Sequence, residues 1–239
     1  MSMGGPQPIR LYLSPEHACG YLPQRTARSA FIDPEHPLDN TQYEYLLAQG
    51  FRRSGEHAYR PHCRGCTRCV PVRVPTAHFA PDRSQRRCLA RNADLSLQIE
   101  RRLDDEHYRL YSDYLAQRHP GGGMDPSDRS AFHSFLDCRW LDARYWCFRL
   151  HGRLVAVAVV DHLPHSLSAV YTFFDPHLHA RGLGTYAVLR QIEAAREQGL
   201  SYVYLGYWVP GSRKMDYKRR FLPLEALGLL GWAPLPHAG

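Results

Sequence analysis

The chain has 239 residues, 44% of them hydrophobic, and a formal net charge of +7 at pH 7. This length suits one large or two small domains, and this hydrophobic content excludes a wholly disordered chain. No apolar run reaches the roughly 20 residues that a membrane-spanning helix needs, and residues 1–17 lack the apolar core of a secretory signal. We therefore expect a cytoplasmic protein that does not contact membranes and whose seven cysteines are reduced.

Basic charge is concentrated in one part of the first half. Residues 52–91 contain ten arginines against two acids, Glu56 and Asp82. An arginine excess of this size is typical of surfaces that bind phosphate backbones. The alternative is a solvated basic surface with no ligand, so the charge favours a nucleic-acid partner without establishing one.

Residues 41–51 (TQYEYLLAQGF) predict the first helix. Thr41 stands at the position of a cap, and Tyr45, Leu46 and Leu47 are expected to face the protein interior. Gly50 is expected to end the helix, because glycine commonly terminates helices.

An extended segment and a basic helix follow. Between residues 70 and 74, valine alternates with proline and arginine, and this period of two indicates a strand. Because proline lacks the amide hydrogen that a sheet ladder requires, Pro71 and Pro75 predict a strand at a sheet edge. Residues 84–95 then predict a basic helix, and residues 96–103 another strand.

From residue 104 onward, two helices precede a sheet. The helices are predicted over residues 104–119 and 127–138, the second capped by Ser127. Three strands joined by short turns follow, which indicates antiparallel pairing. They are residues 143–150, 153–163 and 167–175.

The second of these strands is nearly all apolar, so we expect it to be covered on both faces. Residues 184–200 predict an amphipathic helix. The strand at 201–209 is reached through this helix and should run parallel to the strand before it. The expected fold class is α+β. An N-terminal basic, cysteine-containing α/β domain (residues 1–103) precedes an acetyltransferase-like domain with a mixed, largely antiparallel sheet (residues 104–239).

The segment HARGLG (residues 179–184) lies between the third strand and the helix. Glycines at a helix start leave backbone N–H groups free to meet an anion. Its pattern resembles the acyl-carrier loop of the GNAT acetyltransferases, except that His179 stands where Arg or Gln is usual. Arg181, Gly182 and Gly184 are the candidate substrate-binding residues, and a glycine-rich helix start without a ligand is the alternative.

The segment CRGCTRC places Cys63, Cys66 and Cys69 three residues apart. C-x-x-C spacing lets two thiolates reach one metal ion, and a third thiol at the same spacing is rare by chance. Structural, reduced thiols are the alternative, and the other three cysteines after this run are expected to be small buried hydrophobic residues. They are Cys88, Cys138 and Cys147.

Three longer segments, residues 18–31, 50–63 and 206–225, resemble the aminoacyl-tRNA–protein transferases of the N-degron pathway. The resemblance covers roughly residues 10–226. It implies transfer of leucine from leucyl-tRNA to proteins with N-terminal Asp or Glu, which marks them for degradation. An arginyl-tRNA donor, a coenzyme A-dependent GNAT acetyltransferase and a non-enzymatic zinc-ribbon nucleic-acid module are the alternatives.

Within residues 206–225, the chemistry of ester aminolysis assigns candidate roles. Lys214 and Lys218 are the only two lysines of the chain, and with Arg213 they can pair with the acceptor's carboxylate or with tRNA phosphate. Tyr207 and Tyr217 can stack on the terminal adenosine or donate to the oxyanion. Outside the segment, Asp175 is the candidate general base, with Asp216 the second choice.

The resemblance also bears on metal binding, which the transfer chemistry itself does not require. Relatives carry an N-terminal C-G-Y-C motif linked to metal or iron–sulfur binding, and this chain reads CGYL at Cys19. Cys19 with Cys63, Cys66 and Cys69 gives four thiols, the number that a zinc or iron–sulfur site requires. His62 is a possible substitute ligand.

Overall fold

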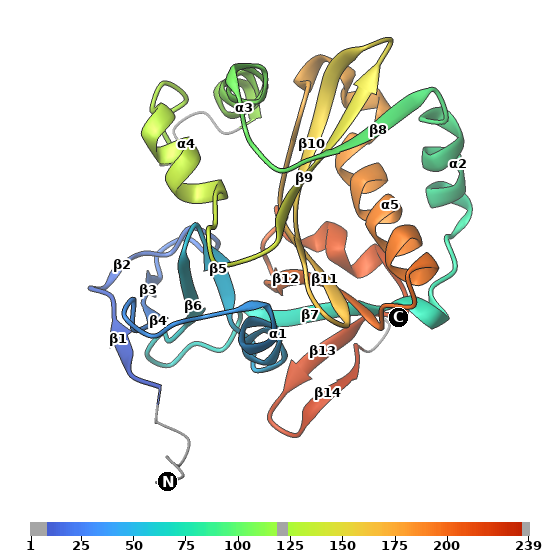
Figure 1. The fold of residues 1–239 in the computed structure, drawn as a ribbon. Helices are drawn as coiled ribbons and strands as arrows, with labels where there is room; N and C mark the ends of the chain where they lie inside the picture. Colours follow the sequence, from blue (N-terminus) through green and yellow to red (C-terminus); the bar gives the residue numbers. More distant parts are fainter. Residues whose placement is uncertain (1–8, 119–123, 236–239) are drawn as a thin grey trace, which may run out of the picture.

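The computed structural model describes residues 9–118 and 124–235 and contains two main sheets (Figure 1). The smaller sheet has four antiparallel strands. Their order is β1 (Leu11–Leu13), β4 (Ser29–Ile32), β6 (His57–Pro61) and β5 (Arg52–Ser54). A two-stranded ribbon, β2 (His17–Ala18) with β3 (Thr26–Ala27), lies beside it.

The larger sheet has eight strands. Their order is β14 (Gly231–Pro234), β13 (Glu225–Gly228), β7 (Val70–Pro75), β12 (Tyr202–Trp208), β11 (Ser166–Phe174), β10 (Arg153–His162), β9 (Ala143–Leu150) and β8 (Leu95–Glu100). All neighbours are antiparallel except β11 and β12. The expected mixed, largely antiparallel sheet is therefore confirmed.

Helices cover both faces of this sheet (Figure 1). The helices are α1 (Asn40–Ala48), α2 (Arg83–Arg91), α3 (Asp105–Arg118), α4 (Arg129–Leu136) and α5 (Leu183–Glu197), with short 3-10 turns η1 (Thr76–His78), η2 (Pro176–Arg181) and η3 (Asp216–Arg220). Alternate residues of β10 enter two cores: Ala156 and Ala158 pack towards α5, and Val157 and Val159 towards α3 and α4. The prediction that this strand is covered on both faces is confirmed.

The parallel strands β11 and β12 form a fork. They pair over only three residues each, 166–168 and 202–204. Beyond this pairing, β11 continues along β10 and β12 continues along β7. The edges of the two strands between the prongs are thus left available to side chains from elsewhere in the chain.

The expectation of an edge position for residues 70–74 is wrong. β7 lies inside the large sheet, between β12 and β13. Its pairing with β13 involves only Val72 and Arg73, which stand between the two prolines. The prolines are accommodated because the β13 ladder does not extend over them.

Two predicted caps are also corrected. Asp39, not Thr41, caps α1, and its carboxylate accepts a hydrogen bond from the N–H of Gln42. Asp128, not Ser127, caps α4. An aspartate one or two residues away competes for the same N–H groups, and it wins because a carboxylate is the stronger acceptor.

The inward face of α1 is shifted as well. Tyr45 is 65% exposed, whereas Tyr43, Leu46 and Leu47 are buried. Residues 43, 46 and 47 follow the spacing of one helix face, and Tyr45 lies outside that face.

The strands formed by the first 103 residues are divided between the smaller and the larger sheet. Strands β7 and β8 both come from this part of the chain and join the larger sheet. The boundary expected at residue 103 therefore does not separate the two sheets. Within the described residues, no helix has the length and apolarity to cross a bilayer.

Candidate active site

Arg52, at the start of β5, inserts its side chain between the prongs of the β11–β12 fork. Its Nη2 donates a hydrogen bond of 2.7 Å to the carbonyl oxygen of Ala169, the first β11 residue beyond the pairing with β12. On β12, Gly206 has φ 82°, and a Cβ there would lie 3.1 Å from Nη2. The guanidinium can approach β12 this closely because position 206 is glycine.

This guanidinium lacks a partner on one side. Arg52 is only 9% exposed, and its Nη1 is buried without a hydrogen bond. Arginine stays protonated in proteins, so this is a buried positive charge. Buried charges are costly unless paired, and an unsatisfied polar atom in such a group points to a partner such as a ligand or an ordered water.

Lys218, in η3, is a second buried cation beside β12. It is 4% exposed, and its Nζ donates a hydrogen bond of 2.6 Å to the carbonyl oxygen of Tyr207. Burial, together with the charge of Arg52, lowers its pKa to about 7. Within the described residues, neither Arg52 nor Lys218 forms an ion pair with a carboxylate. We call Arg52, Gly206, Tyr207 and Lys218 the fork site.

The two candidate tyrosines differ in availability. The hydroxyl of Tyr207 is buried and donates 2.8 Å to the carbonyl oxygen of Gly50, so it is engaged within the protein. The Tyr217 side chain is exposed, and its ring lies 5.7 Å from the Lys218 ammonium. Tyr217 is thus the tyrosine that can stack on a ligand without breaking a hydrogen bond.

The remaining candidates in residues 206–225 lie at the surface. Arg213 and Lys214 are exposed and have no ion-pair partner within the described chain. Asp216 is also exposed and accepts a hydrogen bond from the Trp208 indole at 3.3 Å. Of the two lysines, Lys218 belongs to the fork site, whereas Lys214 is free to contact a substrate outside it.

Asp175, the candidate general base, is buried at the end of β11. One of its carboxylate oxygens accepts from the N–H of His177 at 2.9 Å, and the other from Arg153 at 2.7 Å. Both oxygens are therefore engaged in capping η2 and in an ion pair. Each oxygen keeps a second lone pair, so these contacts do not exclude proton uptake, and the role of Asp175 as base stays a prediction.

The glycine loop is braced from α2. Arg181 pairs through two bonds of 2.8 Å with Asp94. The buried Asn92 donates 2.9 Å to the carbonyl oxygen of Arg181. Gly182 adopts the left-handed conformation (φ 67°) where α5 begins, and Gly184 lies against Phe174. These contacts fix the loop, and substrate binding by its residues stays a prediction.

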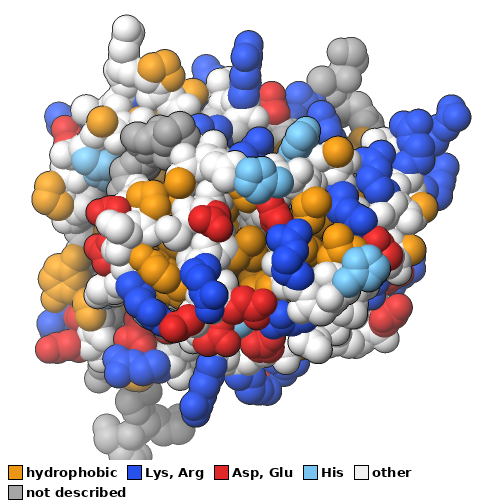
Figure 2. Space-filling model, turned by 90° about the horizontal axis from the view of Figure 1, so that it is seen from above, with side chains coloured by type: hydrophobic (Ala, Val, Ile, Leu, Met, Phe, Trp, Pro, Cys, Tyr) orange, Lys and Arg blue, Asp and Glu red, His pale blue; other side chains and the backbone are white. Residues whose placement is uncertain are grey.

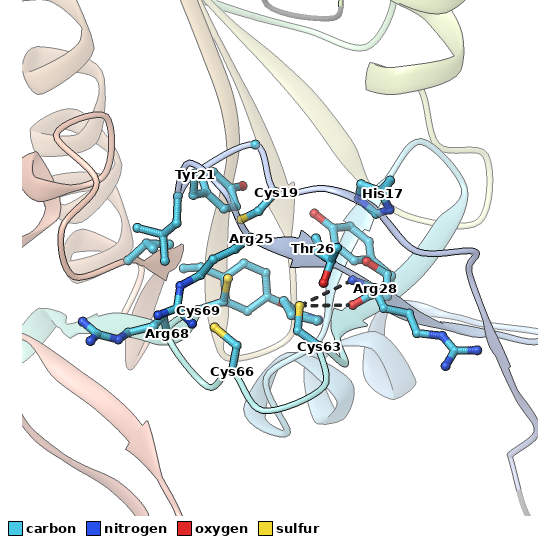
Figure 3. A pocket seen from close by; sticks show the side chains of 18 residues that line it. His17, Cys19, Tyr21, Arg25, Thr26, Arg28, Cys63, Cys66, Arg68 and Cys69 are labelled. Carbon is cyan, nitrogen blue, oxygen red and sulfur yellow. Dashed lines mark hydrogen bonds between the residues drawn. The ribbon is translucent and has the colours of Figure 1, made fainter.

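The four candidate metal ligands surround one cavity (Figure 3). It measures about 260 Å³, and Tyr207 of the fork site also lines it. Cys19 comes from the β2–β3 ribbon, and Cys63, Cys66 and Cys69 from the loop before β7. Cavity and fork site are therefore neighbours across Tyr207.

The thiols do not fit a shared ion as they stand. Sulfur ligands lie about 2.3 Å from zinc, which places two of them about 3.8 Å apart. Among the described residues, no three of these thiols gather even within 4.8 Å. Burial and the neighbouring thiols raise the pKa of Cys69 to about 12, so its sulfur carries a proton near neutral pH when no ion is bound. Metal binding by this set stays a prediction.

Two sequence profiles match the chain. The profile described as arginine-tRNA-protein transferase, N terminus, matches residues 17–87, and the one for the C terminus matches residues 106–228. Among solved structures, FemX has a TM-score of 0.46 at 11% identity, covering 85% of this chain and 81% of its own. The structure of L-PGS from Bacillus licheniformis also has a TM-score of 0.46, at 12% identity, over 70% of this chain and 48% of that one.

Curated relatives are much more similar. An aspartate/glutamate leucyltransferase from Stenotrophomonas maltophilia (strain K279a) is 52% identical over 94% of this chain and 92% of its own. One from Pseudomonas aeruginosa (strain LESB58) is 47% identical over 95% and 97%. Profiles that match most of the chain, and relatives this similar over nearly its whole length, place it in the arginine-tRNA–protein transferase family.

Proposed function

We propose that this protein transfers leucine from leucyl-tRNA to the α-amine of proteins that begin with Asp or Glu. The names of its relatives support this activity. The observation that carries the proposal is the fork site, where two buried cations have no carboxylate partner among residues 9–118 and 124–235. The side chain of an N-terminal Asp or Glu supplies that missing negative charge.

The reaction is the aminolysis of an ester. The acceptor nitrogen attacks the ester carbonyl carbon, the C–N bond forms, and the C–O bond to the terminal ribose breaks. An α-amine has a pKa of about 8, so the reactive unprotonated form is available near neutral pH. The protein has to hold amine and ester together and to stabilise negative charge.

Arg52 and Lys218 divide these tasks. The Nη1 of Arg52 has no hydrogen-bond partner in the described part of the chain, which makes it the natural partner for the acceptor carboxylate. Lys218, with its pKa near neutrality, becomes fully charged when an anion binds beside it. Tyr217 and Lys214 are exposed outside the pair, which supports a contact with the aminoacyl end of the tRNA.

Helix α2 supports a tRNA contact beside the glycine loop. Its four arginines are exposed, and the guanidinium of Arg91 donates to the carbonyl oxygen of Ala180 in that loop. They are Arg83, Arg86, Arg87 and Arg91. Figure 2 shows basic side chains gathered along the edge on which Figure 1 draws α2. A phosphate backbone can follow this edge towards residues 179–184.

The proposal is tested with labelled leucyl-tRNA and peptides that begin with Asp, Glu, Asn or Ala. Label should move to the Asp and Glu peptides, because only these bring a carboxylate into the fork site. Arginyl-tRNA in parallel identifies the donated amino acid. Equal transfer to Asn or Ala peptides would contradict the assigned specificity, and acetyl-coenzyme A turnover without any transfer would favour the acetyltransferase alternative.

Affinity for an acidic N-terminus should depend on pH through Lys218. Below a pKa of about 7 the ammonium is charged and attracts the carboxylate; as pH rises through that value the charge is lost. Affinity for an Asp peptide, measured by calorimetry without tRNA, should fall by up to about tenfold per pH unit above this point.

The matched control is Lys218→Arg, whose guanidinium stays charged over the whole range. In this variant, the affinity for the Asp peptide should not fall as the pH rises above about 7, because residue 218 keeps its charge. The same alkaline loss in the variant would assign the titration to another group.

A further inference from the structure

Three side chains that can bind a metal ion lie close together beneath the first turn of α3, away from the cysteine cavity. They are Glu100 on β8, His107 on α3 and Cys147 on β9. The Nε2 atom of His107 lies 3.1 Å from the sulfur of Cys147 and 3.6 Å from a carboxylate oxygen of Glu100. One donor atom from each residue lies within 4.8 Å of the other two.

The strand register brings the two sheet residues together. Gln98 of β8 stands opposite Cys147 of β9. Glu100 is two residues further on, so its side chain leaves the same face as Gln98. Helix α3 covers this face, and His107 in its first turn completes the group.

The carboxylate of Asp104 fixes the tautomer of His107. Its Nδ1 lies 2.7 Å from a carboxylate oxygen of Asp104. Two acceptors at this distance would repel each other, so Nδ1 carries the hydrogen and donates it. Nε2 is then left with its lone pair directed at Cys147 and Glu100. Histidines that bind metals have their other ring nitrogen held in this manner.

The spacing matches a tetrahedral zinc site. Ligand distances of about 2.1 Å for nitrogen and oxygen and 2.3 Å for sulfur place neighbouring ligand atoms about 3.4 to 3.6 Å apart. The two distances from Nε2, 3.1 and 3.6 Å, lie close to these values. The third separation, between the Cys147 sulfur and the Glu100 carboxylate, is at most 4.8 Å, so the sulfur and the carboxylate have to adjust for one ion to reach all three.

We propose that Glu100, His107 and Cys147 bind one Zn²⁺ ion, with water as the fourth ligand. On binding, the S–H bond of Cys147 breaks, the thiolate sulfur coordinates the ion, and the proton passes to solvent. The carboxylate and the thiolate balance the charge of the ion. Arg149 lies 3.5 Å from the other oxygen of Glu100 and keeps its closer pair with Glu106 at 2.8 Å.

Exposure defines the role of this site. Glu100 is partly exposed, with a side-chain exposure of 31%, whereas His107 and Cys147 are fully buried. The ion enters beside Glu100, and no substrate can reach the thiol. The bound ion would therefore tie β8, β9 and the start of α3 together, although structural zinc sites are usually closed by four protein ligands rather than by three and a water.

Cobalt tests the proposal, because a thiolate bound to Co²⁺ gives a charge-transfer absorption in the near ultraviolet. The metal-free full chain carrying serine at residues 19, 63, 66 and 69 is titrated with Co²⁺ and then with Zn²⁺. We expect one equivalent of Co²⁺ with the thiolate band, displaced by Zn²⁺. Adding Cys147→Ser should remove the band, and Cys88→Ser, at another buried cysteine, should retain it.

Asp104→Asn serves as the milder variant, because Asp104 lies at the surface and does not bind the ion itself. It should weaken Zn²⁺ binding by about 10–100-fold in the otherwise native chain, with an unchanged circular dichroism spectrum. Absence of the thiolate band from the four-serine protein would overturn the proposal, as would its persistence after Cys147→Ser. If the chain with the four serines does not fold, the same Co²⁺ titration is made on the native chain with and without Cys147→Ser. A thiolate band that is weaker in the variant supports the proposal, and an unchanged band overturns it.

Discussion

Replacing Arg52 by methionine should remove most of the transfer to acidic acceptors and leave the protein folded. Loss of one partner of a buried charge pair costs about 2–5 kcal/mol, which corresponds to a fall in kcat/KM on the order of 10² to 10³ for Asp peptides. Stability should be unchanged or higher, because Nη1 is a buried donor without a partner. Transfer assays and urea unfolding measure the two effects separately.

Two further variants locate the effect. Arg52→Lys keeps a positive charge and should retain more activity than Arg52→Met. Gly206→Ala leaves Arg52 in place but puts a methyl group 3.1 Å from its guanidinium, at a backbone φ that disfavours alanine; its activity should fall as well. Full activity of Arg52→Met towards Asp peptides would show that Arg52 does not bind the acceptor carboxylate.

The adjacent arginine should behave in the opposite way: Arg53→Met is expected to unfold the protein far more easily. Arg53 and Asp161 form a fully buried ion pair at 2.6 Å. Arg53 also donates to the carbonyl oxygens of Gly55 and Leu136. Without it, Asp161 is left as an unpaired buried charge, which costs about 3–5 kcal/mol. The free energy of unfolding, from urea titration, measures the loss.

The double variant Arg53→Met with Asp161→Leu provides the control. Replacing both charges by apolar groups is often nearly neutral, so stability should largely return. A loss below 1 kcal/mol in the single variant, or a double variant no more stable than the single one, would mean that the pair does not act as a buried ion pair.

The contrast between these neighbours shows where sequence reasoning reaches its limit. Residues 52 and 53 lie on opposite faces of β5, as any strand predicts. Their partners, Ala169 and Asp161, stand 117 and 108 residues away. Nothing local in the sequence indicates which arginine has its charge paired, so Arg52 was only one of ten in a basic stretch.

The second half of the fold was more predictable. Short turns, apolar strands and one amphipathic helix define β9, β10, β11, α5 and β12 and their directions, because each pairs with a neighbour in sequence. β7 was misplaced because its partners β12 and β13 follow more than a hundred residues later. The caps were missed by one or two residues, since several side chains of the same type compete there.

For the candidate site, the sequence singles out residues 206–225, but it does not show the environment of each side chain there. Lys214 and Lys218 look equivalent in sequence, yet only Lys218 is buried. Arg181, in the glycine loop, and Asp175, at the end of a strand, stand at sequence positions that are typical of functional residues. Asp94 and Arg153, which engage them, come from other elements that sequence spacing cannot bring together.

The position of β7 has a consequence for protein synthesis. Arg73 of β7 hydrogen-bonds Tyr204 of β12, a residue 131 positions later. At typical rates of translation, β7 leaves the ribosome on the order of ten seconds before its partner. During that interval, its valines and the neighbouring thiols are exposed in a nascent chain that cannot yet close its central sheet. The arginines on either side of it then also serve to keep the waiting segment in solution.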